Sequence, residues 1–338
     1  MAGRRGILRT GGWAAGLGLL LFYGLYGPRR AGAQTPVAGG RPSFQVDVNL
    51  IKVPVAVLDE QGRPLTGLER HDFDLYEDGV PQDIQQLIVD TEPVEAVLLL
   101  DISRSVHREL NKVRKAAHNF AKALGKQSRF SLVTFADEVE VLRDWTNNVR
   151  ALDRALHKVS SGLRTCMYDG IYLAAEDQLR HVEGKKAIIM LTDGIDNDSR
   201  ATYRQAADAL LRSQASLYVV GLTNMVQPQM EKIYRIRYVA RALENLGETE
   251  PIKKFFDGKR RALEDLSQMT GGRTLFPNSF DELDAAYGQI ADELKQKTFL
   301  TYVSKNQDRS RLYRKIEVRC RREGATVLHR AGYYIRTP

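Results

Sequence analysis

An alternation of short apolar runs with amphipathic segments, between Val94 and Lys297, constrains this chain more than any other feature. The run from Val97 to Leu100 contains no polar residue and ends at Asp101, which is typical of a strand buried on both faces. The next stretch, from Val106 to Leu124, repeats apolar residues at steps of three and four. That spacing predicts a helix with one buried face.

The same alternation continues along the chain. Apolar runs predict strands at 130–135, 139–142, 187–191 and 217–222, and helices are expected between them near 148–158, 168–180 and 202–213. Strands and helices in this order predict an α/β fold, in which a mostly parallel sheet lies between helices. We place this domain at residues 91–297.

The stretch 223–257 interrupts the rhythm, because it contains Pro228, Gly247 and Pro251. We interpret it as a partly mobile insertion on the rim of the sheet, with some helical character between Met230 and Leu246. A helix is expected to resume at 262–269, and the periodic residues from Leu283 to Leu294 predict a last helix.

The flanking segments 34–90 and 298–338 have the two-residue alternation of strands. Val53, Val55 and Val57 alternate with other residues, and Pro54 between them indicates an edge position or a bulge. Near the C-terminus, strands are expected at 299–304, 313–319 and 327–335. Because each segment supplies too few strands to be stable alone, we expect the two to form one β module.

Residues 1–33 combine three early arginines, an apolar run from Trp13 to Tyr26 and the small-x-small sequence Ala31-Gly32-Ala33. This pattern predicts a secretory signal peptide, and so an exported protein, periplasmic or secreted, with no membrane span after cleavage. The apolar run is shorter than the roughly 20 residues of a spanning helix, and an uncleaved N-terminal anchor is the alternative. Although export permits disulfides, we expect the two cysteines, Cys166 and Cys320, to remain separate thiols.

Charge argues against a nucleic-acid partner. The net charge is +8, and residues 1–33 hold five arginines without an acid, which leaves +3 for the rest of the chain. Motifs for a nucleophile elbow, a zinc protease, a phosphate-binding loop or a redox dithiol are absent from the sequence. We therefore expect a binding protein and not an enzyme.

One group of oxygen-bearing side chains points to a metal. Asp101, Ser103 and Ser105 leave the end of the first buried strand together, Thr165 precedes a helix, and Asp193 ends another buried strand. Ligands gather at such strand ends in open α/β sheets. Two carboxylates and three hydroxyls suit a hard divalent cation, Mg²⁺ or else Mn²⁺ or Ca²⁺, with a coordination position left open. On the residues alone, the alternative is that Asp101 and Ser103 cap a helix and Asp193 makes a turn.

The sequence Asp101-Ile102-Ser103-Arg104-Ser105, followed by Thr165 and by Leu191-Thr192-Asp193-Gly194, closely resembles the metal-ion-dependent adhesion site of von Willebrand factor type A domains. With the flanking Glu77-Asp78-Gly79 and Thr270-Gly271-Gly272, the chain looks like the exported proteins related to these domains that are abundant in acidobacteria. The resemblance implies a Rossmann-like A domain. It also implies that Ser103, Ser105 and Thr165 touch the metal through hydroxyls, and Asp101 and Asp193 directly or through water.

Two features depart from that pattern. Arg104 stands where a small residue is usual, and Asp196 and Asp198 follow the last motif aspartate. We interpret these two acids as turn and cap residues for the next helix, although a second ion is the alternative. The expected function is metal-dependent capture of a partner protein's Asp or Glu. The alternative is a structural A-domain scaffold whose partner binds without metal.

Overall fold

A computed structural model describes residues 50–103, 106, 109–159, 162–239, 250–306 and 310–335 of the chain. Within these ranges, side chains of 234–239 and 250–251 are not described. The predicted signal peptide, the strand-like residues before Leu50, and both Arg104 and Ser105 lie outside the described residues.

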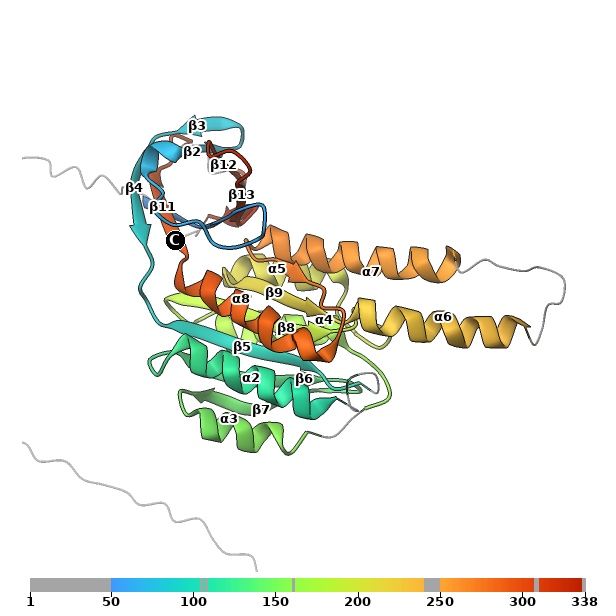
Figure 1. The fold of residues 1–338 in the computed structure, drawn as a ribbon. Helices are drawn as coiled ribbons and strands as arrows, with labels where there is room; N and C mark the ends of the chain where they lie inside the picture. The colour runs from blue at the N-terminus through green and yellow to red at the C-terminus, as the bar shows by residue number, and fades with distance from the viewer. Residues whose placement is uncertain are drawn as a thin grey trace, which may run out of the picture. The chain divides into compact units, whose positions relative to one another are not determined.

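The central sheet has six strands in the order β10-β9-β8-β5-β6-β7, and all neighbours except β6 and β7 are parallel (Figure 1). β5 has neighbours on both sides, and its residues Val97 to Leu100 are almost completely buried. The expected mostly parallel sheet between helices is thereby confirmed. The strands are β5 (Val94–Asp101), β6 (Arg129–Phe135), β7 (Val139–Thr146), β8 (Lys185–Thr192), β9 (Ser216–Gly221) and β10 (Thr274–Leu275).

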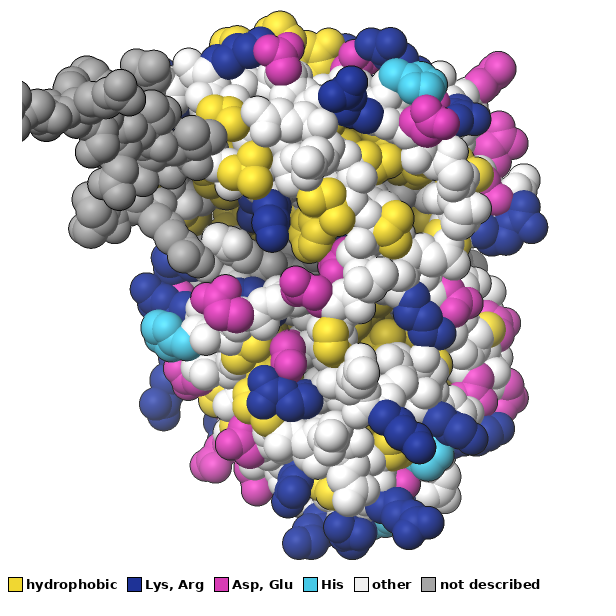
Figure 2. All heavy atoms as spheres, turned by 90° about the vertical axis from the view of Figure 1, so that its left-hand side faces the viewer, with side chains coloured by type: hydrophobic (Ala, Val, Ile, Leu, Met, Phe, Trp, Pro, Cys, Tyr) yellow, Lys and Arg dark blue, Asp and Glu magenta, His cyan; other side chains and the backbone are white. Residues whose placement is uncertain are grey.

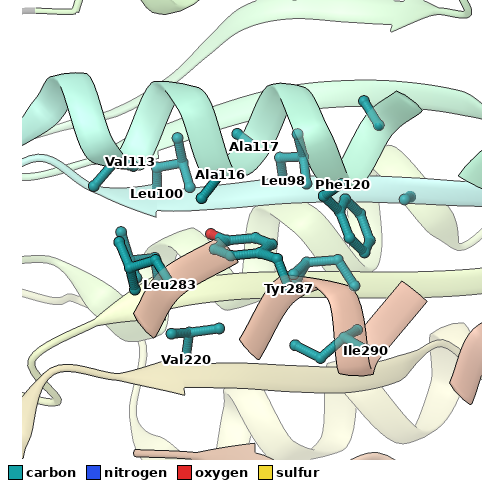
Figure 3. Packing of buried hydrophobic residues seen from close by; sticks show 14 of the residues in the cluster. Leu98, Leu100, Val113, Ala116, Ala117, Phe120, Val220, Leu283, Tyr287 and Ile290 are labelled. Carbon is teal, nitrogen blue, oxygen red and sulfur yellow. The ribbon is translucent and has the colours of Figure 1, made fainter. Parts of the chain in front are cut away.

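Helices cover both faces of this sheet. Alternate residues of β5 point to opposite faces, so each face packs with its own set of helices. Leu98 and Leu100 pack with α2 and α8, where the Phe120 and Tyr287 rings meet edge to face at 5.6 Å (Figure 3). Val97 and Leu99 pack with α4, α5 and α7 on the other face. The helices are α2 (Leu110–Leu124), α3 (Val149–Leu156), α4 (Met167–Leu173), α5 (Tyr203–Ser213), α6 (Thr223–Val239), α7 (Glu250–Met269) and α8 (Leu283–Lys295), and a π-helical turn (Ala174–Leu179) extends α4.

The helical character expected between Met230 and Leu246 is confirmed for residues 230–239, but helix covers more of 223–257 than the sequence predicted. α6 begins directly after β9, and α7 begins at Glu250, twelve residues before the expected start at 262. Pro251 lies in the first turn of α7, where a helix does not use the missing N–H. Pro228 lies inside α6, next to Gln227, whose Oε1 accepts a 2.6 Å hydrogen bond from Arg260 of α7. Contact between the two helices therefore outweighs the local cost of this proline. Residues 240–249 lie outside the described part of the chain.

The terminal segments build two antiparallel sheets, in the orders β13-β1-β11-β4 and β14-β12-β2-β3. β1 pairs with β11 from Leu50↔Val303 to Val55↔Thr298, and β2 pairs with β12. The two sheets share a core that includes Val55, Leu75 and Ile316, which confirms a flanking β module built from both ends of the chain. Its strands are β1 (Leu50–Leu58), β2 (Phe73–Glu77), β3 (Val80–Gln82), β4 (Ile84–Val89), β11 (Thr298–Val303), β12 (Tyr313–Cys320), β13 (Thr326–His329) and β14 (Gly332–Tyr334).

The single strand expected at 327–335 is two strands in different sheets. β13 pairs with β1, whereas β14 pairs with β12. Between them, the Ala331 N–H donates to the Met269 carbonyl at the end of α7 (2.8 Å), and Arg330 forms an isolated bridge with Thr270. These bonds to the α/β domain turn the chain from one sheet to the other.

Candidate metal site

The candidate site lies where the neighbouring strands β5 and β8 end. The strand that follows β5 in the chain, β6, lies on one side of this pair, and the strand that follows β8, β9, lies on the other side. Asp101 is the last residue of β5 and Asp193 follows β8, and both are buried. Leu100 and Leu191 are partners in the parallel ladder, so the two strands end side by side. Thr192 at the end of β8 donates its hydroxyl to Oδ2 of Asp101 (3.0 Å). This crevice is the place where open α/β sheets bind ligands.

The turn after β5 folds back on its own carboxylate. The N–H of Ser103 donates to Oδ1 of Asp101 (2.9 Å), and the Ser103 carbonyl accepts from the N–H of Val106 (3.0 Å). Ser103 is buried beside Asp101. Ser105, the third member of this motif, is not among the described residues.

The loop before α4 is held against this turn by its backbone. The Gly162 N–H donates to the Ile102 carbonyl (3.2 Å), and Gly162 forms an isolated parallel bridge with Ser103. A Cβ atom at Gly162 would lie 2.5 Å from the Cβ of Ala136, so this approach requires glycine. The loop therefore presents Thr165, which is buried, at the edge of the same crevice.

The loop after β8 binds the Thr165 loop in turn. The Thr165 N–H donates to Oδ1 of Asn197 (2.9 Å), and the Asn197 N–H donates to the Thr165 carbonyl (3.0 Å). Asp193 accepts from the N–H of Ile195 (3.0 Å). The structure thus brings together the segments that carry four of the five predicted residues. Thr192, which bonds to Asp101, and Asn197, which bonds to Thr165, were not identified from the sequence. The position of Thr192, a polar residue at the end of an apolar run, is a signal that could have identified it.

The roles of Asp196 and Asp198 differ from the sequence interpretation. Asp196 accepts from the N–H of Met167 (2.8 Å), so it caps α4, the preceding helix. The helix after it, α5, has Thr202 as its N-cap instead. Asp198 pairs with Arg164 at 2.9 Å. Asp196 and the start of α4 are 29 residues apart in the sequence. Rules for helix caps, which consider only neighbouring residues, therefore do not predict this contact.

Electrostatics favour a cation in the crevice. Burial, with a further contribution from the Asp193 carboxylate, raises the pKa of Asp101 to about 7, against the lowering effect of hydrogen bonds from Ser103 and Thr192. Two buried carboxylates near each other are costly, and a divalent ion would offset that cost. Among the residues that the structure describes, no three His, Cys, Asp or Glu side chains gather into a metal cluster. An ion here would therefore need hydroxyl oxygens as well as the two carboxylates, which is the donor set of a hard cation.

Cys166 follows Thr165 and is buried, and burial raises the pKa of its thiol to about 11. Cys320 lies in β12. Both cysteines are free thiols in the structure.

A family model of the von Willebrand factor type A domain matches residues 95–250, slightly less than half of the chain. The match agrees with the fold of the central sheet and includes the ends of β5 and β8. No curated protein sequence matches the chain.

Solved structures with a similar fold include proximal thread matrix protein 1 from the mussel byssus, in a form with a zinc-occupied MIDAS motif. It is 16% identical, with a TM-score of 0.46, and the match covers 65% of this chain and 50% of that one. The chain thus spans about half the length of the mussel protein. The vWF domain of the pilus tip protein Mfa5 from Porphyromonas gingivalis is 13% identical (TM-score 0.42; 60% and 94% covered). BatB from Bacteroides thetaiotaomicron is 18% identical (TM-score 0.41; 60% and 99% covered).

Proposed function

We propose that this chain is an exported, metal-dependent protein-binding protein. In this proposal Asp101, Ser103, Ser105, Thr165 and Asp193 hold a divalent cation, Mg²⁺ in the first place and Mn²⁺ or Ca²⁺ as alternatives. The ion, when bound, offers an open coordination position to an Asp or Glu carboxylate of a partner protein. The observation that carries the proposal is the convergence of three loops on two buried carboxylates at the ends of β5 and β8.

The chain's own residues prepare this site. The Thr192 hydroxyl and the Ser103 N–H fix the two oxygens of Asp101. Asn197 fixes the backbone of Thr165, and Ile195 fixes one oxygen of Asp193. Because these positions are set by the fold, metal binding would cost little reorganisation.

Export and the class of partner are parts of the same proposal. Export is supported by the signal-peptide pattern of residues 1–33, and the flanking motifs support a relation to the exported proteins of acidobacteria. No helix in the described ranges is long and apolar enough to cross a membrane. On the face shown in Figure 2, Lys and Arg side chains are interspersed with Asp and Glu. This mixture fits a protein partner better than a nucleic acid.

Titration calorimetry with MgCl₂, MnCl₂ and CaCl₂ tests the metal site on the chain without residues 1–33. We expect the wild-type protein to bind an ion and to gain about 2.7 kcal/mol of stability at a hundredfold excess over Kd. Asp193→Asn should lose this binding. Asp198→Asn is the matched control, because its carboxylate lies in the same loop but pairs with Arg164, and it should bind like wild type. Wild-type affinity in Asp193→Asn would contradict the proposal and favour the structural scaffold.

A further inference from the structure

Leu163 is the most exposed of the large hydrophobic side chains that the structure describes, at 78%. It stands two residues before Thr165, on the rim of the candidate site. Single exposed apolar residues are common on protein surfaces. The backbone at Leu163 is held by a side chain: its N–H and that of Arg164 both donate to Oδ1 of Asp137, at 3.1 and 2.6 Å.

The backbone before Leu163 is fixed as well, by the Gly162 bonds to the turn after β5. The backbone of residues 162–164, which presents the exposed side chain, is therefore held by hydrogen bonds. When a partner contacts Leu163, this backbone loses little conformational freedom. The entropy cost of binding is therefore small.

A second exposed apolar side chain lies on α7, the helix that packs against the residue after Asp193. A Cβ atom at Gly194 would lie 3.1 Å from Cδ1 of Leu263 and 3.5 Å from Cβ of Lys259, so α7 packs directly over the residue after Asp193. Nζ of Lys259 lies 5.2 Å from the ring centroid of Phe255, one helical turn along α7, and Phe255 is 45% exposed. Figure 1 shows α7 and α6 extending past the end of β5 where Asp101 lies.

We propose that Leu163 and Phe255 form an apolar rim on two sides of the candidate metal site, with Lys259 as its cationic neighbour. This inference rests on the proposed function and specifies its partner. The partner is an extended acidic protein segment in which apolar side chains adjoin the Asp or Glu that reaches the ion. The apolar neighbours contact Leu163 and Phe255, and a further acidic residue pairs with Lys259. The ion recognises any carboxylate, so the rim supplies the discrimination between acidic segments.

Synthetic peptides of equal net charge test the rim. One set carries a central Asp flanked by Leu and Phe, and the other carries the same Asp flanked by Ser. With Mg²⁺ present, we expect the wild-type chain without residues 1–33 to bind the apolar set about tenfold more tightly, since a partly buried Leu or Phe contributes roughly that factor. Leu163→Ser and Phe255→Ser should each reduce this preference severalfold while Mg²⁺ affinity is unchanged.

Leu312→Ser is the matched control, because Leu312 is also exposed, at 55%, but precedes β12 of the β module. It should keep the full preference. If the wild-type protein binds Mg²⁺ and both peptide sets equally, or if Leu163→Ser and Phe255→Ser keep the preference, the apolar rim is refuted while the metal site stands. If the wild-type protein binds no ion, or binds the peptides equally well in EDTA, the proposed function fails and the rim fails with it.

Discussion

The position of Thr165 in the candidate site depends on a close approach between two backbone segments. Thr165 reaches the crevice only because Gly162 lies against Ala136 and the turn after β5. A glycine, which has no side-chain oxygen, therefore controls where the hydroxyl of a candidate ligand lies.

Gly162→Ala tests this dependence. Its Cβ would lie 2.5 Å from the Ala136 Cβ and 3.1 Å from the Asp137 nitrogen, so the loop must shift, at a cost of about 1–3 kcal/mol. We expect weaker Mg²⁺ binding by calorimetry and a lower thermal midpoint. Gly258→Ala, inside α7 with nothing within 4 Å of the new Cβ, should instead gain roughly 0.5–1 kcal/mol. Equal metal affinity in Gly162→Ala and wild type would show that the loop position does not matter.

Lys297 gives a second test at a single residue. It is buried, and its Nζ donates to Ser216 Oγ (2.7 Å) and to the Gly271 carbonyl (3.1 Å). Burial lowers its pKa to about 8, although the Glu293 carboxylate opposes the shift. The unfolded chain holds this proton up to a pKa of about 10.4. Between these values the unfolded state binds more protons, so the free energy of unfolding should rise with pH.

Between pH 8 and pH 10 the free energy of unfolding should rise by about 2 kcal/mol, since one pKa unit is about 1.4 kcal/mol and each state is only partly titrated at one end of this range. Urea unfolding at pH 8 and at pH 10 measures it. Lys297→Met removes the titrating group and should abolish this part of the rise. An identical pH dependence in the variant and the wild-type protein would exclude Lys297 as its source.

Among the elements, ion pairs between distant parts of the chain fix the position of a short helix in the β module. The single-turn helix η1 (Arg70–Asp72) is bound to the turn after β12 through Asp72. Arg322 donates to both carboxylate oxygens of Asp72, at 2.7 and 3.0 Å. This bidentate pair joins the N-terminal segment of the module to its C-terminal segment.

The Asp72 tether should make the module acid-sensitive. The hydrogen bonds from Arg322 hold the pKa of Asp72 at about 2. An aspartate has a pKa of about 3.9 in an unfolded chain, so this stabilisation is present above pH 4 and is lost as the pH falls toward 2. We expect Asp72→Asn to have a lower thermal midpoint than wild type at pH 6. At pH 2 the difference between the two thermal midpoints should be smaller. Asp83→Asn, whose side chain is 89% exposed in its pair with Lys305, should show little change at either pH.

For the described molecule as a whole, the β module makes the two ends of the chain interdependent. β1 lies between β13 and β11, so both of its neighbours come from the C-terminal segment. β2 likewise pairs with β12. The α/β domain is inserted between the two halves of a shared core.

Deletion of residues 299–338 tests this interdependence. It removes both neighbours of β1 and one neighbour of β2, so limited proteolysis should cleave residues 50–90 rapidly. The strands and helices between β5 and α8 should stay resistant, because their core clusters lie within the α/β domain. Protection of 50–90 in the truncated protein would mean that the N-terminal strands hold together without their partners.

The sequence by itself determined the elements that have a strong local pattern. The apolar run ending at Asp101 and the periodic residues of α2 and α8 gave correct predictions, because burial on one or both faces leaves a period in the chain itself. The order of strands and helices then predicted the mostly parallel sheet, and the strand ends predicted where Asp101 and Asp193 lie.

Only the tertiary structure decided features that depend on contacts distant in sequence. Pro228 and Pro251 indicate breaks locally, but α6 and α7 are helices in contact with each other. The strand expected at 327–335 divides because Ala331 bonds to the end of α7. Asp196 caps a helix that precedes it by almost thirty residues, and Asn197 fixes Thr165 across a similar distance. These features depend on hydrogen bonds and packing that form only when the chain is folded. They therefore cannot be predicted from the local sequence pattern.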